Sequence, residues 1–203
     1  QHSYRKLINN LEYFAQHRGS TKVVLNLTIT PQAIKDIGHA IELAKRYNLD
    51  GVRIQHYNYL LPQEFNEQKR VIKKIFGMDS TTNEIQVTQE VFDLAKQLIS
   101  LKKRLTKELF PIPLQWAPSL TDAEIEDWYS TEEFKTKRRC LFPWRGILVD
   151  ADGKVYPCSK IYLECGDLNK EKTFEAWNSA KMKRFRCYLR KRLFPACSRC
   201  CKL

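Results

Sequence analysis

The sequence has 203 residues, of which 43% are hydrophobic and 29% charged, and its net charge is +12. A chain of this length and balance can bury a core, which excludes wholesale disorder. The longest apolar run is far shorter than the roughly 20 residues that span a bilayer. The first ten residues, QHSYRKLINN, contain no secretory apolar segment. We therefore expect a soluble, cytoplasmic protein.

Charge and cysteine content both divide the chain near residue 130. Residues 131–203 hold 18 Lys and Arg against 8 Asp and Glu, a net charge of +10, whereas residues 1–130 carry +2. All seven cysteines lie beyond residue 139. We therefore predict two domains, 1–130 and 131–203. The basic part could attract nucleic acid or an acidic partner, but a solvated basic face explains the charge better.

The first domain is predicted to begin with an amphipathic helix over residues 4–17. The β-branched run KVVLNLTIT (22–30) predicts a strand, and Thr30-Pro31 predicts the start of a helix that ends near Asn48. A second strand is predicted for DGVRIQHYNYL (50–60). This alternation with short connections indicates a parallel α/β sheet.

The rest of the first domain is less regular. Residues 61–88 are polar and without clear periodicity, with one short helix expected around 69–76. A further amphipathic helix is predicted over 91–105, an extended proline-rich segment over 111–120, and a short helix whose start at Thr121 forms a capping box with Glu124. Two parallel strands alone do not make a stable sheet, so the pattern indicates the second half of a larger α/β barrel.

Ligands of parallel α/β proteins collect at the carboxyl ends of the strands. Gln55 and His56 follow the core of the second predicted strand, so they are candidate cofactor-binding residues. The alternative, which we favour, is that Gln55 only ends the strand and His56 is a structural histidine with a satisfied hydrogen bond.

Four cysteines of the second domain have the pattern of a metal site. Cys140 precedes the run GILVDADGKVYPC, in which the Asp-Gly pair predicts a hairpin. The hairpin would bring Cys140 and Cys158 toward the same end. Cys197 and Cys200 form a C-x-x-C pair, a spacing that lets both sulfurs reach one centre from a tight turn.

Spacing alone leaves the metal open. Four thiolates suit one 4Fe–4S cluster and suit a structural zinc ion about equally well. Disulfides are disfavoured, because the chain lacks a secretory segment and is larger than a disulfide-stabilised mini-protein. Cys165 and Cys187 are expected to be spectators, while Cys201 is the best substitute if Cys200 is not a ligand.

The ordered motifs of the last third of the chain resemble the SPASM-type auxiliary-cluster domain of radical S-adenosylmethionine enzymes. They are a cysteine that leads into a hairpin with a DG turn and a PC end, a GDLN turn, a helix with Trp177-Asn178, and a terminal C-x-x-C. Asp167 stands in the GDLN turn where the family more often has Asn. The resemblance implies that Cys140, Cys158, Cys197 and Cys200 hold an auxiliary 4Fe–4S cluster.

The preceding part is similar in element order to the last strand–helix units of the radical-SAM barrel. The expected fold is therefore the C-terminal part of a parallel, partial TIM-like α/β barrel, followed by a small α+β cysteine-rich cluster-binding domain. These enzymes hold their catalytic cluster through C-x-x-x-C-x-x-C, and this sequence has no such motif. We expect the C-terminal portion of a longer enzyme or a partner subunit, with S-adenosylmethionine and a second 4Fe–4S cluster bound only by the full-length parent.

The implied function is radical-based oxidoreductase chemistry, in which the auxiliary cluster engages substrate or passes electrons. The implied partners are the absent N-terminal half and an electron donor such as flavodoxin or ferredoxin. Two rival functions stay open: a non-catalytic zinc module that contacts nucleic acid, and an iron–sulfur electron-transfer subunit. Nucleic acid is the weaker expectation, because no recognised reader motif is present. The substrate is not indicated, since one scaffold serves many substrates.

Overall fold

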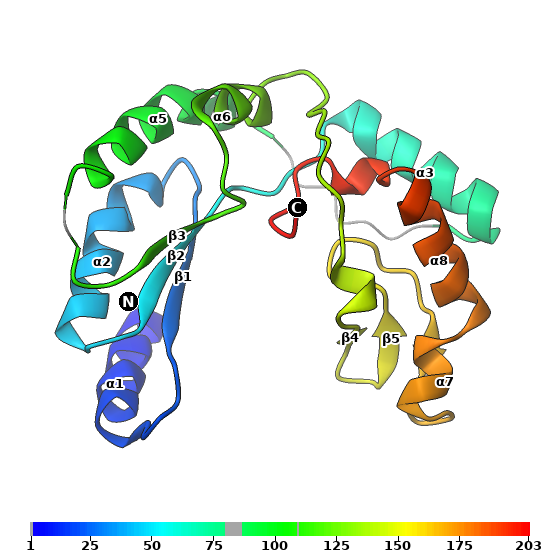
Figure 1. Ribbon diagram of the computed structural model, residues 1–203, viewed down its shortest axis with the longest axis horizontal. Helices are drawn as coiled ribbons and strands as arrows, with labels where there is room; N and C mark the ends of the chain where they lie inside the picture. The colour runs from blue at the N-terminus through cyan, green and yellow to red at the C-terminus, as the bar shows by residue number, and fades with distance from the viewer. Residues whose placement is uncertain (1, 80–86, 109) are drawn as a thin grey trace. The chain divides into compact units, whose positions relative to one another are not determined.

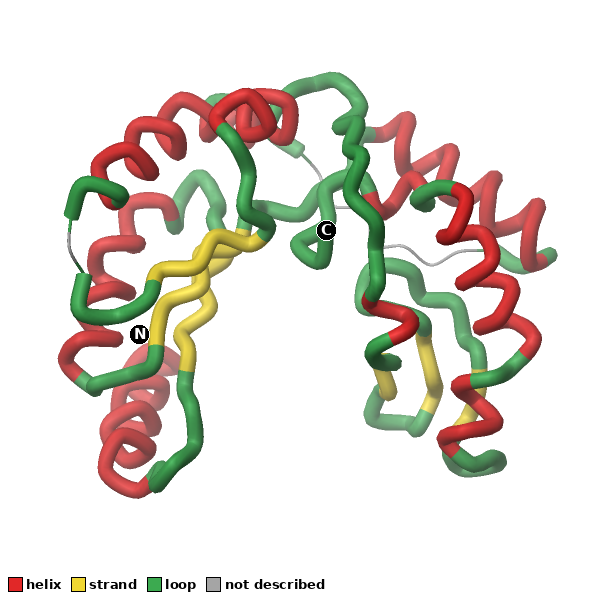
Figure 2. Tube along the Cα trace, in the orientation of Figure 1, coloured by secondary structure: helices red, strands yellow, loops and turns green. Residues whose placement is uncertain are grey.

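A computed structural model describes residues 2–79, 87–108 and 110–203. The chain is a mixed α/β protein that forms two compact units, Gln1–Tyr57 with Gln89–Tyr129, and Asn58–Thr88 with Ser130–Leu203. Each unit has a three-stranded sheet, drawn in yellow in Figure 2. Within the described ranges, no helix is both long and apolar enough to cross a membrane.

The first unit is built on a parallel sheet, as the sequence predicts. Strands β1 (Val24–Thr28), β2 (Gly51–Gln55) and β3 (Leu114–Ala117) lie side by side in that order (Figure 1). The third strand comes from the proline-rich segment that the sequence marks only as extended. Gly51 lets the β3 segment approach closely, because a Cβ there would lie 2.9 Å from the carbonyl oxygen of Pro113.

The helices of the first unit are α1 (His2–His17), α2 (Ile37–Arg46), α4 (Gln89–Phe92), α5 (Leu94–Leu105) and α6 (Asp122–Trp128). Helix α2 packs against β1 and β2, and α5 packs against α6. The predicted capping box is confirmed: the Glu124 N–H donates to Thr121 Oγ1 at 3.2 Å, and the Thr121 N–H donates to Glu124 Oε2 at 2.8 Å.

The helix predicted from Thr30-Pro31 begins later than expected. Thr30 Oγ1 accepts the Ala33 N–H at 3.1 Å, which caps a turn rather than an α-helix. A short 3-10 segment, η1 (Ile34–Asp36), follows and leads into α2. The predicted helix start at Thr30-Pro31 is therefore wrong: the regular helix begins six residues after Pro31, with Asp36 at its N-cap position.

The second unit contains the predicted hairpin. Strands β4 (Leu148–Val149) and β5 (Lys154–Tyr156) pair antiparallel, and β6 (Gly166–Asp167) pairs with β5. Gly153 turns the hairpin with φ +79°, a conformation that side chains rarely adopt. The helical elements are α3 (Pro62–Phe76), η2 (Phe142–Trp144), α7 (Thr173–Trp177), α8 (Ala180–Lys191) and η3 (Pro195–Cys197).

Helix α3 corrects the prediction for residues 61–88. It has 15 residues instead of a short turn around 69–76, it starts with Pro62, and Gly77 in the left-handed region ends it. Its buried residues are Glu64, Gln68 and Ile72. Two of these three are polar, so the apolar periodicity that reveals a helix in sequence is broken. Residues 80–86 of this segment lie outside the described residues.

Helix α3 belongs to the second unit, although the boundary drawn from charge and cysteine content places it in the first domain. Ile72 contributes to one core together with Val155 of the hairpin, Ala176 of α7 and Phe185 of α8. Helix α3 also packs against η3, which contains Cys197. The segment after β2 therefore supports the cysteine-bearing part of the chain.

Candidate metal centre

Electrostatic interactions link Cys197 with each of the other three predicted ligands. Burial raises the pKa of Cys197, and the neighbouring thiolates of Cys158 and Cys140 raise it further. Cys197 in turn contributes to the raised pKa of Cys200. In the described ranges, no group of three or more His, Cys, Asp or Glu side chains is arranged to hold a metal ion. The ligand set therefore stays a prediction.

Backbone N–H groups surround these four sulfurs. Burial raises the pKa of Cys140 and of Cys158, and hydrogen bonds from the N–H groups of Phe142 to the first and of Lys160 and Ile161 to the second oppose that rise. The same opposing effect on the pKa comes from the N–H of Phe194 at Cys197 and of Lys202 at Cys200. Such donors stabilise thiolates, which is the form that binds iron or zinc. These N–H donors therefore favour the thiolate form of each of the four cysteines.

Lys160 places a cation among the cysteines. Burial lowers the pKa of its ammonium group, and the thiolates of Cys200, Cys201, Cys158 and Cys197 oppose this change. A Cys₄-ligated cluster is anionic, so a nearby ammonium group would stabilise it. Sequence reasoning missed Lys160, because one lysine in a basic domain carries no distinguishing pattern.

Cys201 forms a close pair with Cys200. The Cys200 thiol donates a hydrogen bond to the Cys201 sulfur, which lowers the pKa of Cys201 and raises that of Cys200. The backbone N–H of Cys201 donates to Asn58 Oδ1 at 3.1 Å. Cys201 thus lies beside Cys200, and its role as a substitute ligand stays a prediction.

The two expected spectators differ in their surroundings. Cys165 is 5% exposed within the core of the second unit, and burial raises its pKa to about 12. Cys187 is exposed on α8. All seven cysteines are free of disulfide bonds.

Arg199, inside the C-x-x-C turn, is anchored in a buried polar network. Its side chain is fully buried, and Nη1 donates to both carboxylate oxygens of Glu64, at 2.9 and 3.0 Å. Nη2 donates to the carbonyl oxygens of Ser130 and Glu132. The guanidinium group also stacks over Tyr59, with 4.5 Å to the ring centroid. The turn that carries Cys197 and Cys200 is therefore tied to α3 and to residues 130–132.

Gln68 adds a second tie from α3. The fully buried Gln68 accepts the Ala196 N–H through Oε1 at 3.0 Å, directly before Cys197. Glu64 and Gln68 lie one helical turn apart on the same face of α3. The sequence contains no signal for this contact, because the partners are separated by more than 120 residues.

Comparison with known proteins identifies this part of the chain. Residues 140–201 match the profile of the SPASM family, an iron–sulfur cluster-binding domain. The C-terminal portion of the chain is of the SPASM type. The matched region includes all four predicted ligands and all three remaining cysteines. The resemblance derived from the motif order is therefore confirmed.

A solved structure is similar in fold over most of the chain. The crystal structure of Streptococcus suis SuiB aligns with a TM-score of 0.50 and 11% sequence identity. The alignment covers 96% of this chain and 44% of the SuiB chain, so this chain spans less than half the length of that relative. No curated protein sequence matches the chain.

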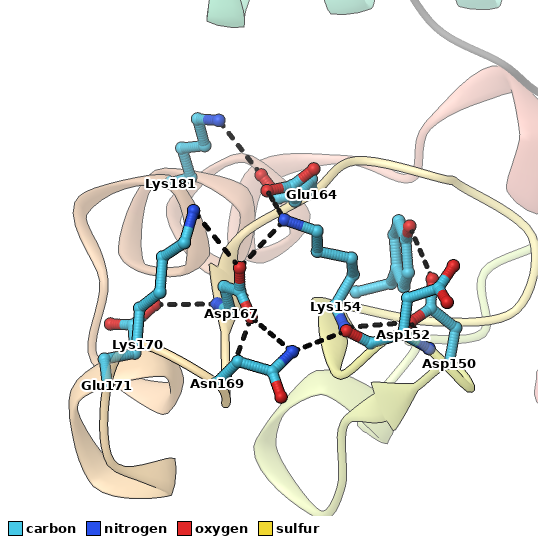
Figure 3. Close-up of polar contacts among 10 residues, drawn as sticks. Asp150, Asp152, Lys154, Glu164, Asp167, Asn169, Lys170, Glu171 and Lys181 are labelled. Atoms are coloured by element: carbon cyan, nitrogen blue, oxygen red, sulfur yellow. Dashed lines mark hydrogen bonds and ion pairs between the residues drawn. The ribbon is translucent and has the colours of Figure 1, made fainter.

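The contacts within the GDLN turn explain why this chain has an aspartate at position 167. Figure 3 shows Lys154 and Lys170 directed toward the Asp167 carboxylate, with Nζ–oxygen distances of 2.9 and 3.6 Å. Asp167 Oδ1 also accepts the backbone and side-chain N–H groups of Asn169, at 3.0 and 3.1 Å. Asn169 donates in turn to the Asp152 carbonyl oxygen in the hairpin turn at 2.7 Å. A carboxylate here joins β5, β6 and the hairpin, and two lysines balance its charge.

We predict that Asp167→Asn lowers the melting temperature by a few degrees at neutral pH, because it removes the charge that Lys154 pairs with. The hydrogen bond from Lys154 is the largest cause that lowers the pKa of Asp167 to about 2. The charged carboxylate therefore stabilises the fold above its unfolded pKa of about 3.9, and the effect is lost as the pH falls through about 2. Asp152→Asn removes the same charge from an exposed neighbour, so equal losses in thermal unfolding of both variants would contradict this role.

The candidate residues of the first unit lie at the end of β2. Gln55 is half-buried and is the last residue of β2. His56 is 1% exposed, and its Nδ1 lies 3.2 Å from the Tyr129 hydroxyl. The rings of Trp116 and Trp128 surround it, each with its centroid 5.7 Å from that of His56. His56 is thus buried and hydrogen-bonded, while cofactor binding by Gln55 and His56 stays a prediction.

We predict that His56 makes the first unit sensitive to acid. Burial, and secondarily the positive charge of Lys102, lowers the pKa of His56 to about 4. Between about pH 6.5 and pH 4, the unfolded state therefore binds a proton that the folded state does not. Stability falls as the pH decreases through this range. The loss should reach about 3 kcal/mol at pH 4. Urea unfolding followed by tryptophan fluorescence should show a flatter pH profile for His56→Gln than for the wild type, and equally steep profiles in the two would contradict this role.

Proposed function

We propose that this chain is the C-terminal portion of a radical S-adenosylmethionine/SPASM enzyme. In it, Cys140, Cys158, Cys197 and Cys200 hold an auxiliary 4Fe–4S cluster. The observation that carries the proposal is the SPASM match over residues 140–201, which contains these four cysteines in the predicted order. The backbone N–H groups directed at the four sulfurs support the same ligand set.

The first unit supports the proposal through its topology. Three parallel strands lie in sequence order with helices between them, as in part of a (β/α) barrel. Strands β1 and β3 each pair with β2 alone within the described sheet. We infer that this unit is the C-terminal part of a partial TIM-like barrel, whose remaining strands belong to the parent enzyme or to a partner subunit.

The chain's own residues would hold and tune the cluster. When bound, the cluster supplies a site for electron transfer or for substrate engagement during radical-based oxidoreduction. Lys160 would offset its negative charge, and the N–H groups around the sulfurs would stabilise the thiolates. Arg199 would act as a positioning residue, because it fixes the turn between Cys197 and Cys200 to α3.

The proposal includes partners and a location. A reduced flavodoxin or ferredoxin would supply electrons, and S-adenosylmethionine and a second 4Fe–4S cluster would bind to the absent half. Seven free cysteines suit the reducing cytoplasm better than an oxidising compartment.

Anaerobic reconstitution tests this proposal. The 203-residue chain should take up roughly four iron atoms and absorb broadly near ~400 nm. With dithionite and S-adenosylmethionine it should form no 5′-deoxyadenosine, because four thiolates leave no open iron position for the cofactor. Joining upstream sequence that carries C-x-x-x-C-x-x-C should restore cleavage. Zinc without iron after reconstitution, or cleavage by this chain alone, would contradict the proposal.

A further inference from the structure

A cavity of about 400 Å³ lies beside helix α8 in the second unit. Two indole side chains, three cationic side chains and one thiol line it: Trp144, Trp177, Lys183, Arg186, Arg190 and Cys187. The helix supplies the last four of these at positions i, i+3, i+4 and i+7 counted from Lys183, which is the pattern of one helix face. The cavity is thus cationic on the α8 side and aromatic on the side of η2 and α7.

Arg186 is the buried and hydrogen-bonded cation of this cavity. It is 9% exposed, and its Nε and Nη1 donate at 2.8 Å to the carbonyl oxygens of Pro143 and Trp177. Its guanidinium carbon lies 4.4 Å from the Trp177 ring centroid. The buried Nη2 has no hydrogen-bond partner in the described part of the chain. A buried guanidinium donor without an acceptor is costly, and the residue that carries it lines the cavity.

Lys183 and Arg190 carry exposed charges at the same cavity. Within the described ranges, neither these two residues nor Arg186 forms an ion pair with a carboxylate. Lysines elsewhere in the same unit do, as Lys154 does with Asp167. Three positive charges around one cavity repel one another, and an anion in the cavity would relieve that repulsion.

We propose that this cavity binds an oxyanion, either a carboxylate or a phosphate, between Arg186, Lys183 and Arg190. Arginine recognises both groups through paired N–H donors, and lysine adds a mobile charge. The indole walls provide an apolar lining for the carbon atoms that carry the anionic group. The proposal depends on the described cavity and not on the proposed function of the cysteines.

Cys187 provides a reporter inside the cavity, because its thiol is exposed there and is outside the predicted ligand set. Iodoacetate carries a carboxylate, whereas iodoacetamide is neutral and otherwise similar in shape. The quantity measured is the rate of Cys187 modification by iodoacetate divided by the rate by iodoacetamide, determined by peptide mass spectrometry on the reconstituted chain. A high ratio means that the cavity selects the anionic reagent. In the wild type this ratio should exceed that of Lys183→Gln/Arg190→Gln by roughly 3- to 10-fold, and the difference should shrink in high salt.

The control is Lys74→Gln, which removes one exposed charge from α3, outside α8 and outside the cavity lining. It should keep the ratio within about twofold of the wild type, because an exposed charge outside the cavity is largely screened. The double variant and the control replace exposed side chains, so both should retain the fold. Arg186→Gln is not used, because Arg186 is buried and its replacement could prevent folding. An equal ratio in the wild type and the double variant overturns the proposal.

Two competing anions distinguish a phosphate ligand from a carboxylate ligand. Millimolar inorganic phosphate and millimolar glutarate are each added before iodoacetamide, and protection of Cys187 is measured. Stronger protection by phosphate assigns a phosphate ligand, and stronger protection by glutarate assigns a carboxylate ligand such as an acidic side chain. Protection by neither, in a chain that retains its circular dichroism spectrum, also overturns the proposal.

Discussion

Replacing Arg199 by methionine is expected to destabilise the second unit by about 3–5 kcal/mol, because it leaves the Glu64 carboxylate buried without its partner. Glu64 is 4% exposed, and besides Arg199 it accepts only the Leu61 N–H among the hydrogen bonds described, at 2.8 Å. Methionine fills much of the arginine volume, so the loss reports the charge and its hydrogen bonds more than a cavity. Denaturant unfolding of the apo chain measures it.

The double variant Glu64→Leu/Arg199→Met separates the ion pair from general disruption. Removing both partners leaves no uncompensated charge, so the double variant should be more stable than Arg199→Met alone. Arg199→Met should also release iron faster from the reconstituted chain, because Arg199 fixes the turn between Cys197 and Cys200 to α3. A double variant that loses the sum of the two single losses, with normal iron retention, would mean that the pair is only packing.

The contrast between β2 and α3 shows which parts of the fold the sequence could predict. The strand GVRIQ alternates the buried β-branched residues Val52 and Ile54 with polar residues, so local pattern suffices to place it. Helix α3 buries Glu64 and Gln68, whose partners Arg199 and Ala196 lie far along the chain. Local periodicity cannot contain that pairing, and the helix was therefore underestimated.

The candidate metal centre also has features that local sequence predicts and features that it does not. The hairpin turn at Gly153 and the C-x-x-C spacing are local, so they could be predicted together with the four cysteines. Lys160 and the N–H groups that face the sulfurs depend on how the loops fold around the centre. Those groups tune a bound metal more than they hold it, so spacing alone could not choose between iron and zinc.

The largest effect on metal content is expected for the ligand cysteines. Cys158→Ser and Cys197→Ser should each lose most of the roughly four iron atoms bound on reconstitution, since serine is a poor ligand for a Cys₄ cluster. Cys187→Ser is the matched control, because it makes the same change at an exposed site on α8. It should keep the full iron content and the absorbance near ~400 nm. Equal iron losses in all three variants would refute the ligand assignment.

The fourth ligand is decided by comparing Cys200→Ser with Cys201→Ser. The two thiols share a hydrogen bond, and Cys200 is buried at 6% exposure while Cys201 is half-buried. The N–H of Lys202 faces the Cys200 sulfur, as N–H groups face the other three predicted ligands. The Cys201 sulfur instead accepts from the side chain of Asn58, whose Oδ1 also accepts the Cys201 N–H. We therefore expect Cys200→Ser to lose the cluster and Cys201→Ser to retain it with a changed reduction potential, because the hydrogen bond to a ligand is altered. The reverse pattern in iron content would move the fourth ligand to Cys201, and loss from both would indicate that the pair acts together.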